Sequence, residues 1–277
     1  MASKDKTALV LCGGGSQGAA EVGLYRAMLE QDIHPDCILG SSVGAINGAF
    51  MASGMSPDRL TKLWLVEISR HSLYRINPEI FWKWRRASSL FKPTGLRRFL
   101  NEKLPVKTFE ELKTPLTIVA TDLQKAEPVY LESGPLVPAL MASCAIPMYF
   151  PPQRHEGKQL VDGGVTNNVP VNRAVEKGAR RLYGILCECM QDLDEPVEGF
   201  LQVFMRSMQV NLRQRIYHDL NKYDGACSFY LIDLCINNRL THMLDFSKTE
   251  AVIEESYRHA KSILVRQHSE DQSGILS

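Results

Sequence analysis

The sequence predicts an α/β fold of three layers, with a central, mostly parallel sheet and helices on both of its faces. Short apolar runs alternate along the chain with longer segments whose apolar residues recur at helical spacing. Two of the apolar runs stop at glycine-rich turns, as buried strands often do. The 277 residues, of which 44% are hydrophobic and 23% charged, suit a globular protein with one large core or two small ones. No linker or internal repeat divides the chain, so we expect a single domain over residues 1–277.

Strands alternate with helices in the first part of the chain. The first strand, TALVLC, is apolar and stops at glycines, which suits a buried parallel strand. A helix begins at Ser56, because Pro57 stands at its first position and apolar residues follow on one face. The expected elements in chain order are a strand at 7–12, a helix at 18–30, a strand at 37–40, a small-residue helix at 43–52 and the helix from Ser56.

The second part of the chain continues the alternation. The expected strands are 115–122, 129–132, 159–162, 181–187 and 228–234, and the expected helices are 136–143, 169–177, 197–223 and 249–265. Residues 134–153 carry no charge and approach the length of a bilayer span, but they contain five prolines. A lipid-exposed helix would leave too many backbone groups without hydrogen bonds there, so we read a buried helix followed by an extended loop.

The termini and the cysteines favour a cytoplasmic protein. The N-terminal residues reach the first glycines after only a few apolar residues, unlike a secretory signal, and we expect no transmembrane helix. The cysteine count is odd, no C-x-x-C pair occurs, and no clustered ligands have the spacing of a metal site, so no metal is expected. The seven cysteines are Cys12, Cys37, Cys144, Cys187, Cys189, Cys227 and Cys235.

A glycine-rich loop follows the first strand and leads into a helix. Residues 13–18 read GGGSQG, so the backbone can approach a ligand closely and point N–H groups toward negative charge. Gly13, Gly15 and Gly18 also satisfy G-x-G-x-x-G, which is typical of dinucleotide-binding proteins. Such a protein would want an acidic residue at the end of the second strand. Asp36 precedes that strand instead, so a dinucleotide-binding oxidoreductase is kept only as an alternative.

A G-x-S-x-G motif follows the second strand. Residues 40–44 read GSSVG at a strand-to-helix turn, which is typical of a nucleophile elbow. Gly40 and Gly44 would relieve crowding around a strained Ser42, whose hydroxyl would lie at the N-terminus of the next helix. The other interpretation is a tight turn in which a serine caps the helix.

The serine hydroxyl needs a base, and Asp162 is the best candidate. It ends the strand at 159–162 and precedes Gly163 and Gly164, so it would lie at the same edge of the sheet as Ser42. An ordinary Asp-Gly turn is the other interpretation. No histidine follows a recognisable strand with a loop signature, although a Ser–His–Asp hydrolase stays as a rival. The histidines are His34, His71, His155, His218, His242, His259 and His268.

Four motifs in this order resemble the patatin-like phospholipases. They are the glycine loop at 13–18, GSSVG at 40–44, ASCAIP at 142–147 and DGG at 162–164, and the resemblance covers about residues 7–181. The family's glycine loop usually has Lys or Arg before its last glycine, where this chain has Gln17. The backbone N–H groups are kept, but a nearby positive charge is absent.

The resemblance implies a lipid acyl hydrolase (a phospholipase A, lysophospholipase or carboxylesterase) with no organic cofactor. Ser42 would be the nucleophile and Asp162 the general base of a dyad without histidine. A non-catalytic lipid-binding relative, made conceivable by Gln17, is a further alternative. The implied oxyanion hole is Gly13, Gly14 and Gly15, with Gly18, Gly40, Gly44, Gly163 and Gly164 as supporting glycines; Asn168 and Pro170 would shape the loop after the base.

A basic, aromatic segment is expected to form a cap or lid at about residues 74–99. Residues 75–99 hold seven positive side chains and one negative, which leaves 25 positive and 30 negative residues in the rest of a chain of net charge +1. Aromatic and basic residues together suit an anionic membrane surface. A helix with its aromatics in the core is the other interpretation, and nucleic acid is not expected. The residues expected at the membrane are Arg75, Trp82, Lys83, Trp84, Arg85 and Arg86.

Overall fold

A mixed sheet of eight strands crosses the centre of the computed structural model, which describes residues 5–68, 75–76, 89–186, 196–233 and 245–273. The strand order is β10-β9-β1-β2-β5-β8-β7, and β6 also pairs with β5. The strands are β1 Lys6–Leu11, β2 Cys37–Ser41, β5 Leu116–Asp122, β6 Glu127–Leu131, β7 Gln153–His155, β8 Lys158–Asp162, β9 Ala179–Leu186 and β10 Ser228–Asp233. From β10 to β5 all neighbours are parallel, whereas β6, β7 and β8 pair antiparallel.

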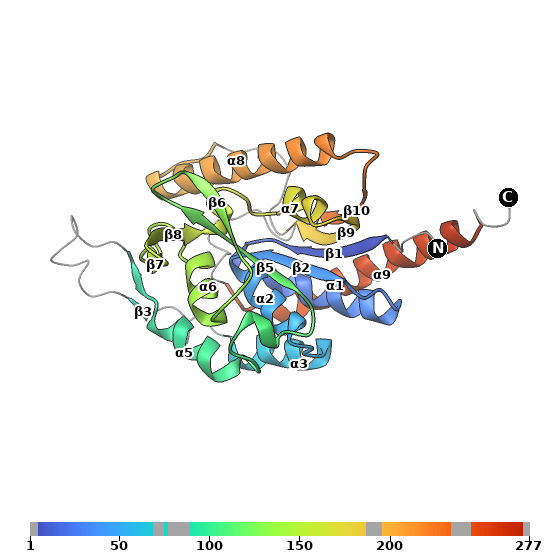
Figure 1. Ribbon diagram of the computed structural model, residues 1–277, viewed down its shortest axis with the longest axis horizontal. Coiled ribbons are helices and arrows are strands. Elements are labelled where there is room, and N and C mark those ends of the chain that lie inside the picture. The colour runs from blue at the N-terminus through green and yellow to red at the C-terminus, as the bar shows by residue number, and fades with distance from the viewer. Residues whose placement is uncertain (1–4, 69–74, 77–88, 187–195, 234–244, 274–277) are drawn as a thin grey trace.

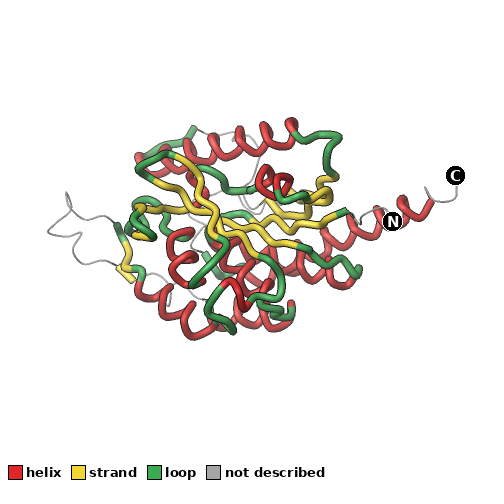
Figure 2. The backbone as a smooth tube through the Cα atoms, viewed as in Figure 1, coloured by secondary structure: helices red, strands yellow, loops and turns green. Residues whose placement is uncertain are grey.

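Helices cover both faces of this sheet, which confirms the predicted fold class. Figure 1 shows α7 and α8 on one side and α1, α2, α3 and α9 on the other, and Figure 2 shows the strands between these two layers. The helices are α1 Ala19–Glu30, α2 Val43–Ala52, α3 Pro57–Lys62, α5 Thr94–Lys103, α6 Leu136–Ser143, α7 Val171–Glu176, α8 Phe200–Lys222 and α9 Thr249–Ser273. Within the described ranges, none of these helices has both the length and the apolar character needed to cross a bilayer.

The three central strands are buried along almost their whole length. Every residue of β2 and β5 is buried, and so is β1 after its first residue. Strands covered on both faces are continuous apolar runs rather than alternating ones, which is why the sequence located them well. Cys12, Cys37 and Cys144 are buried free thiols, and Cys37 is the first residue of β2. Cys227 is half-buried, and the other cysteines lie outside the described residues.

The register of β5 brings the ends of two other strands together. Ser41, the last residue of β2, pairs with Val119, and Asp162, the last residue of β8, pairs with Ala120. Both Val119 and Ala120 also pair with β6, which occupies the other edge of β5. Because β2 runs parallel to β5 and β8 runs antiparallel, their carboxyl ends meet head to head on one edge of β5.

Some elements differ from the sequence-based expectation. The glycine loop continues into a 3-10 turn at Gly15–Gly18 before α1 begins. The expected extended loop after α6 contains β7, which hydrogen-bonds to β8. The last helix runs on to Ser273, past the expected end. Strand pairing and tertiary packing determine these features, so a local sequence pattern does not predict them.

The described residues of the basic, aromatic segment form structure that the sequence did not predict. Arg75 begins the short strand β3, Arg75–Ile76, which pairs with β4, Phe91–Lys92. Phe99 in α5 is buried and packs edge-on against Phe50, and Phe91 contacts Tyr149. Phe99 therefore belongs to the core, whereas Phe91 is half-buried. Trp82, Lys83, Trp84, Arg85 and Arg86 lie outside the described residues.

Helices α1 and α9 cross at a contact that only glycine permits. A Cβ added at Gly23 would lie 2.1 Å from the Ser256 Oγ and 2.4 Å from the carbonyl oxygen of Ile253. The second contact is with backbone, so a side-chain rotation does not relieve it. Arg26 adds ion pairs with Glu30 and Glu254 at the partly exposed rim of the same contact.

We expect Gly23→Ala to lower the free energy of unfolding by about 1–3 kcal/mol, because α9 must move away from α1. The usual effect of Gly→Ala inside a helix is a gain of about 1 kcal/mol, so the sign is diagnostic. Urea unfolding measures the change. Arg26→Ala is the matched control and should cost about 1 kcal/mol or less. A gain in stability for Gly23→Ala would refute the close crossing.

Candidate active site

Ser42 occupies a strained turn between β2 and α2. Its φ is 53° and its ψ is −124°, a conformation that residues other than glycine rarely adopt. The turn is possible because Gly40 and Gly44 flank it. A Cβ at Gly40 would lie 2.5 Å from the Gly44 carbonyl oxygen, and one at Gly44 would lie 2.6 Å from the Leu11 carbonyl carbon. The G-x-S-x-G sequence thus forms a sharp strand-to-helix turn, as expected for a nucleophile elbow.

Ser143 fixes this turn by hydrogen bonds. The Ser42 N–H donates to the Ser143 Oγ at 2.8 Å, and the Ser143 hydroxyl donates to the carbonyl oxygen of Val119 at 2.6 Å. The next residues of the same block reach the other half of the site, because the Asp162 N–H donates to the carbonyl oxygen of Ala145 at 3.0 Å. The block at 142–147 therefore links both candidate residues. The sequence offered this block only as a motif and did not indicate what it does.

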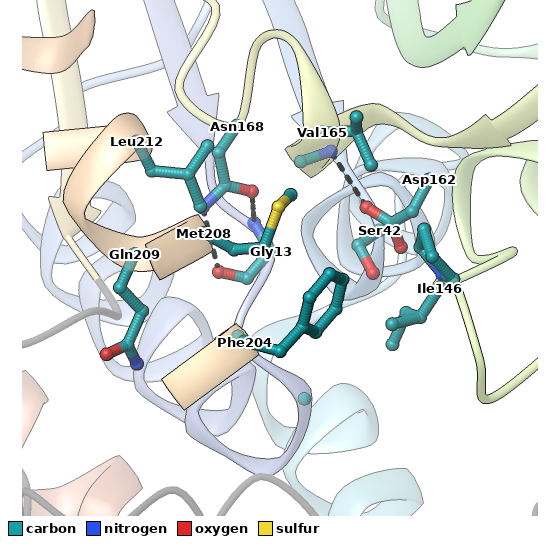
Figure 3. A pocket seen from close by; sticks show the side chains of 14 residues that line it. Gly13, Ser42, Ile146, Asp162, Val165, Asn168, Phe204, Met208, Gln209 and Leu212 are labelled. Atoms are coloured by element: carbon teal, nitrogen blue, oxygen red, sulfur yellow. Dashed lines mark hydrogen bonds between the residues drawn. The ribbon is translucent and has the colours of Figure 1, made fainter. Parts of the chain in front are cut away.

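Asp162 is buried beside Ser42, and one of its carboxyl oxygens is not used by the hydrogen bonds of the fold. Its Oδ1 accepts the Gly164 N–H at 2.8 Å, whereas Oδ2 has no hydrogen-bond partner in the described part of the chain. Figure 3 shows the Ser42 and Asp162 side chains next to each other. The Thr121 hydroxyl donates to the Asp162 carbonyl oxygen at 2.9 Å and so fixes the backbone of this strand end.

The surroundings of Asp162 make its carboxyl an unusually strong base for an aspartate. Burial raises its pKa from the ordinary 3.8 to about 7, while the Ser42 hydroxyl and the Gly164 N–H lower it by smaller amounts. A buried carboxyl without a cation beside it holds a proton more tightly, since the charged form loses its hydration. Near neutral pH this group can therefore both accept and release a proton.

Asn168 fixes the start of the glycine loop. The Gly13 N–H donates to the Asn168 Oδ1 at 2.7 Å, and the Asn168 Nδ2 donates back to the Gly13 carbonyl oxygen at 3.2 Å (Figure 3). The Gly13 N–H is therefore already used, which corrects the expectation that it would face a ligand. The N–H groups of Gly14 and Gly15 have no hydrogen bond among the contacts described for this loop, and both residues line the same cavity as Ser42.

The glycines at 18, 163 and 164 lie in close contact with the residues around Ser42 and Asp162. Gly18 lies against the side chain of Val43, and Gly163 lies against the Val119 carbonyl and Ser41. Gly164 provides the N–H that binds Asp162. The four motifs are thus brought together around Ser42.

Two cavities open on either side of Ser42. The first has about 640 Å³ of empty space and the second about 570 Å³, and part of each is open to solvent. The first is lined by the glycine loop, Asp162, Asn168 and the α8 residues Phe204, Met208, Gln209 and Leu212 (Figure 3). The second is lined mainly by apolar side chains of α2, α5 and the π-helical segment Leu63–Glu67. Gly15, Ser42 and Ile146 line both.

The arrangement gives little support to the two rival chemistries. Asp36 accepts the Thr7 N–H at 2.7 Å, at the opposite end of β1 from the glycine loop, so it is far from any nucleotide bound there. The histidines whose side chains are described line neither cavity; they are His34, His155, His218 and His259. Among the described residues no three His, Cys, Asp or Glu side chains gather as they would around a metal ion.

A family model described as patatin-like phospholipase matches residues 9–175, which include every motif above. An uncharacterized NTE family protein of Mycobacterium tuberculosis is 31% identical over 172 residues, which are 61% of this chain and 45% of that protein. Patatin-like phospholipase domain-containing protein 7 of Rattus norvegicus is 31% identical over 183 residues, 64% of this chain and 13% of that protein. The match thus spans less than half of either relative.

A solved structure shares the fold. VipD from Legionella pneumophila superposes with a TM-score of 0.55 at 14% sequence identity, over 95% of this chain and 67% of that one. At this identity the likeness concerns the path of the chain rather than the chemistry.

We expect Ser143→Ala to lower the free energy of unfolding by about 1–3 kcal/mol, because the buried Ser42 N–H loses its acceptor. Urea unfolding measures the loss. Ser53→Ala is the matched control: its hydroxyl binds the Phe50 carbonyl, which also accepts the Met55 N–H and so keeps a partner. That variant should cost about 1 kcal/mol or less. Equal losses in the two variants would argue against a special role for Ser143.

Proposed function

Since the chain belongs to the patatin-like phospholipase family, we propose that it hydrolyses carboxylic esters of lipids with Ser42 as nucleophile and Asp162 as general base. One observation carries the proposal. A buried carboxyl of raised pKa, with one oxygen free of other hydrogen bonds, lies beside a serine held in a strained turn. Nothing else among the described side chains at this site could accept the serine proton near neutral pH.

The first half of the reaction forms an acyl-enzyme. The Ser42 Oγ attacks the ester carbonyl carbon, and its proton passes to the Asp162 Oδ2. The carbonyl oxygen becomes an oxyanion that the N–H groups of Gly14 and Gly15 stabilise, each donor contributing on the order of 3 kcal/mol. The C–O bond to the alcohol then breaks, and the Asp162 proton goes to the departing oxygen.

The second half repeats the proton transfer with water. Asp162 is ionised again after the alcohol leaves, so it accepts a proton from a water that attacks the acyl carbon. When the second tetrahedral species breaks down, this proton returns to the Ser42 Oγ and the fatty acid is released. A pKa of about 7 serves both directions, because the same carboxyl must take the proton and give it back.

Backbone donors provide the anion stabilisation in this proposal. Gln17 stands where the family usually has a cation, and it adds no charge to the loop. The free N–H groups of Gly14 and Gly15 and the N-terminal end of α2 act together at the developing negative charge. A non-catalytic lipid-binding protein would bind vesicles without turning over esters, and the variants below distinguish the two.

We expect Ser42→Ala to reduce ester hydrolysis to background and Asp162→Asn to reduce kcat/KM by about 10²–10⁴-fold, since one lacks the nucleophile and the other the base. The assay uses p-nitrophenyl esters and phospholipid, and a fluorophosphonate probe reports whether Ser42 is labelled.

His155→Ala, on a side chain outside both cavities, is the control and should stay within about twofold of the wild type. Unlabelled wild-type protein, or full activity in Ser42→Ala, contradicts the assignment of Ser42. A histidine-dependent loss with an active Asp162→Asn contradicts the dyad.

The pKa of Asp162 also gives an expected dependence of stability on pH. In the folded protein the carboxyl keeps its proton up to about pH 7, whereas in the unfolded chain it loses it near the ordinary 3.8. The folded state thus binds more protons between these values, so this group's contribution to stability is full below pH 4 and is lost as the pH rises through 7. Asp162→Asn escapes this loss.

We therefore expect Asp162→Asn to be more stable than the wild type at pH 8, by on the order of 2–4 kcal/mol, with the gap shrinking at pH 5. Urea unfolding at the two pH values measures it. Asp122→Ala is the contrasting control on β5: Asp122 Oδ1 accepts two backbone N–H groups, so this variant should lose stability. An Asp162→Asn gap that does not change with pH would refute a raised pKa.

A further inference from the structure

The two cavities that meet at Ser42 differ in one chemical respect. Asp162 lines the first cavity and not the second. The first also holds the amides of Asn168 and Gln209, whereas the described lining of the second contains no carboxylate, amide or cation. Burial raises the pKa of the Cys144 thiol well above its usual range, so this thiol too is uncharged in the wall of the second cavity.

Proton transfer during ester cleavage assigns a side to each half of the substrate. The departing alcohol oxygen must receive the proton that Asp162 took from Ser42, so this oxygen has to lie on the Asp162 side of the acyl carbon. The tetrahedral carbon has three other substituents. One is the oxyanion, which faces the glycine loop, and another is the Ser42 Oγ. The remaining substituent of the tetrahedral carbon is the acyl chain, which therefore points away from Asp162.

We propose that the second cavity is the acyl-chain site and that the first takes the alcohol half of the ester. This assignment rests on the proposed function, because it follows from the path of the Asp162 proton. The substrate class is then an ester of an apolar fatty acid, whose alcohol half lies in the cavity that contains Gln209.

The wall of the acyl-chain site is fixed rather than adaptable. The Trp64 Nε1 donates to the Asn47 Oδ1 at 2.9 Å, and the Asn47 Nδ2 donates to the Gly18 carbonyl oxygen and to Glu21, both at 2.8 Å. Phe246 lies against the Trp64 ring with centroids 6.3 Å apart. The indole is thereby tied to α2 and to the end of the glycine loop, so the depth of the site is set by the fold.

Ile46 is placed to set the usable depth. It lies four residues after Ser42 on α2, about one helical turn away, and its side chain lines only the second cavity. A longer acyl chain buries more apolar surface until it reaches the wall of the cavity. The affinity for the ester and its rate of hydrolysis should therefore depend on acyl-chain length. A larger side chain at Ile46 shortens the site, and a smaller one at Leu96, on the α5 wall, enlarges it.

The test is a chain-length series of p-nitrophenyl esters, from acetate through octanoate to palmitate, assayed with Ile46→Phe and Leu96→Ala. We expect Ile46→Phe to lower kcat/KM for palmitate by about 10-fold or more while acetate changes by about threefold or less. Leu96→Ala should shift the ratio of palmitate to acetate the other way. Circular dichroism and fluorophosphonate labelling of Ser42 report whether each variant is folded and competent, and the two opposed variants keep the test decisive if one fails to fold.

Met208→Phe is the matched control, because Met208 lines only the first cavity. It should keep the wild-type order of chain lengths. It should also lower turnover of lysophosphatidylcholine relative to the p-nitrophenyl ester of the same fatty acid, by about 10-fold, because the bulky alcohol half meets the new ring.

The assignment is overturned if Ile46→Phe slows all chain lengths equally, or if Met208→Phe rather than Ile46→Phe changes the preference. Failure of the proposed function has a different signature. In that case the wild type shows no Ser42-dependent turnover of any ester and no labelling, and both proposals fall together.

Discussion

The site depends on the way two strands share one edge of β5. Ser41 and Asp162 pair with the adjacent residues Val119 and Ala120, so the ends of β2 and β8 meet although their sequences are more than a hundred residues apart. The parallel part of the sheet delivers the serine, and the antiparallel part delivers the aspartate from the opposite direction. The block at 142–147 then ties both ends together through Ser143 and Ala145. The proposed dyad of Ser42 and Asp162 rests on this head-to-head meeting.

The same geometry imposes costs that the rest of the fold must offset. Ser42 is kept at a positive φ, and Asp162 is kept in a buried position where ionisation is unfavourable. Neither feature stabilises the protein. They persist because the surrounding strands are fully buried and because Ser143, Thr121 and Asn168 hold the adjoining backbone by hydrogen bonds. Stability is thus lowered locally at the two groups that the proposed reaction uses.

Much of this arrangement could be predicted from the sequence, because local patterns encode it. Apolar runs marked the buried strands, and glycines marked the turns that carry Ser42 and precede α1. The partner of Gly13 could not be predicted, since Asn168 lies 155 residues away and reaches it only in the folded sheet. The burial of Phe99 could not be predicted for a related reason: its neighbours in the sequence are basic, but it packs against Phe50 in the folded core. The composition of a segment does not report which of its side chains find an apolar partner.

In the proposed reaction, Asp162 removes the proton from Ser42. The most direct measurement is the rate of Ser42 phosphonylation by a fluorophosphonate as a function of pH, in the wild type and in Asp162→Asn. We expect the wild-type rate to rise with pH and level off above an apparent pKa of about 7. Asp162→Asn should react about 10²-fold more slowly or worse, and its rate should lack that dependence on pH. An Asp162→Asn protein with the wild-type rate and pH profile would contradict this role of Asp162.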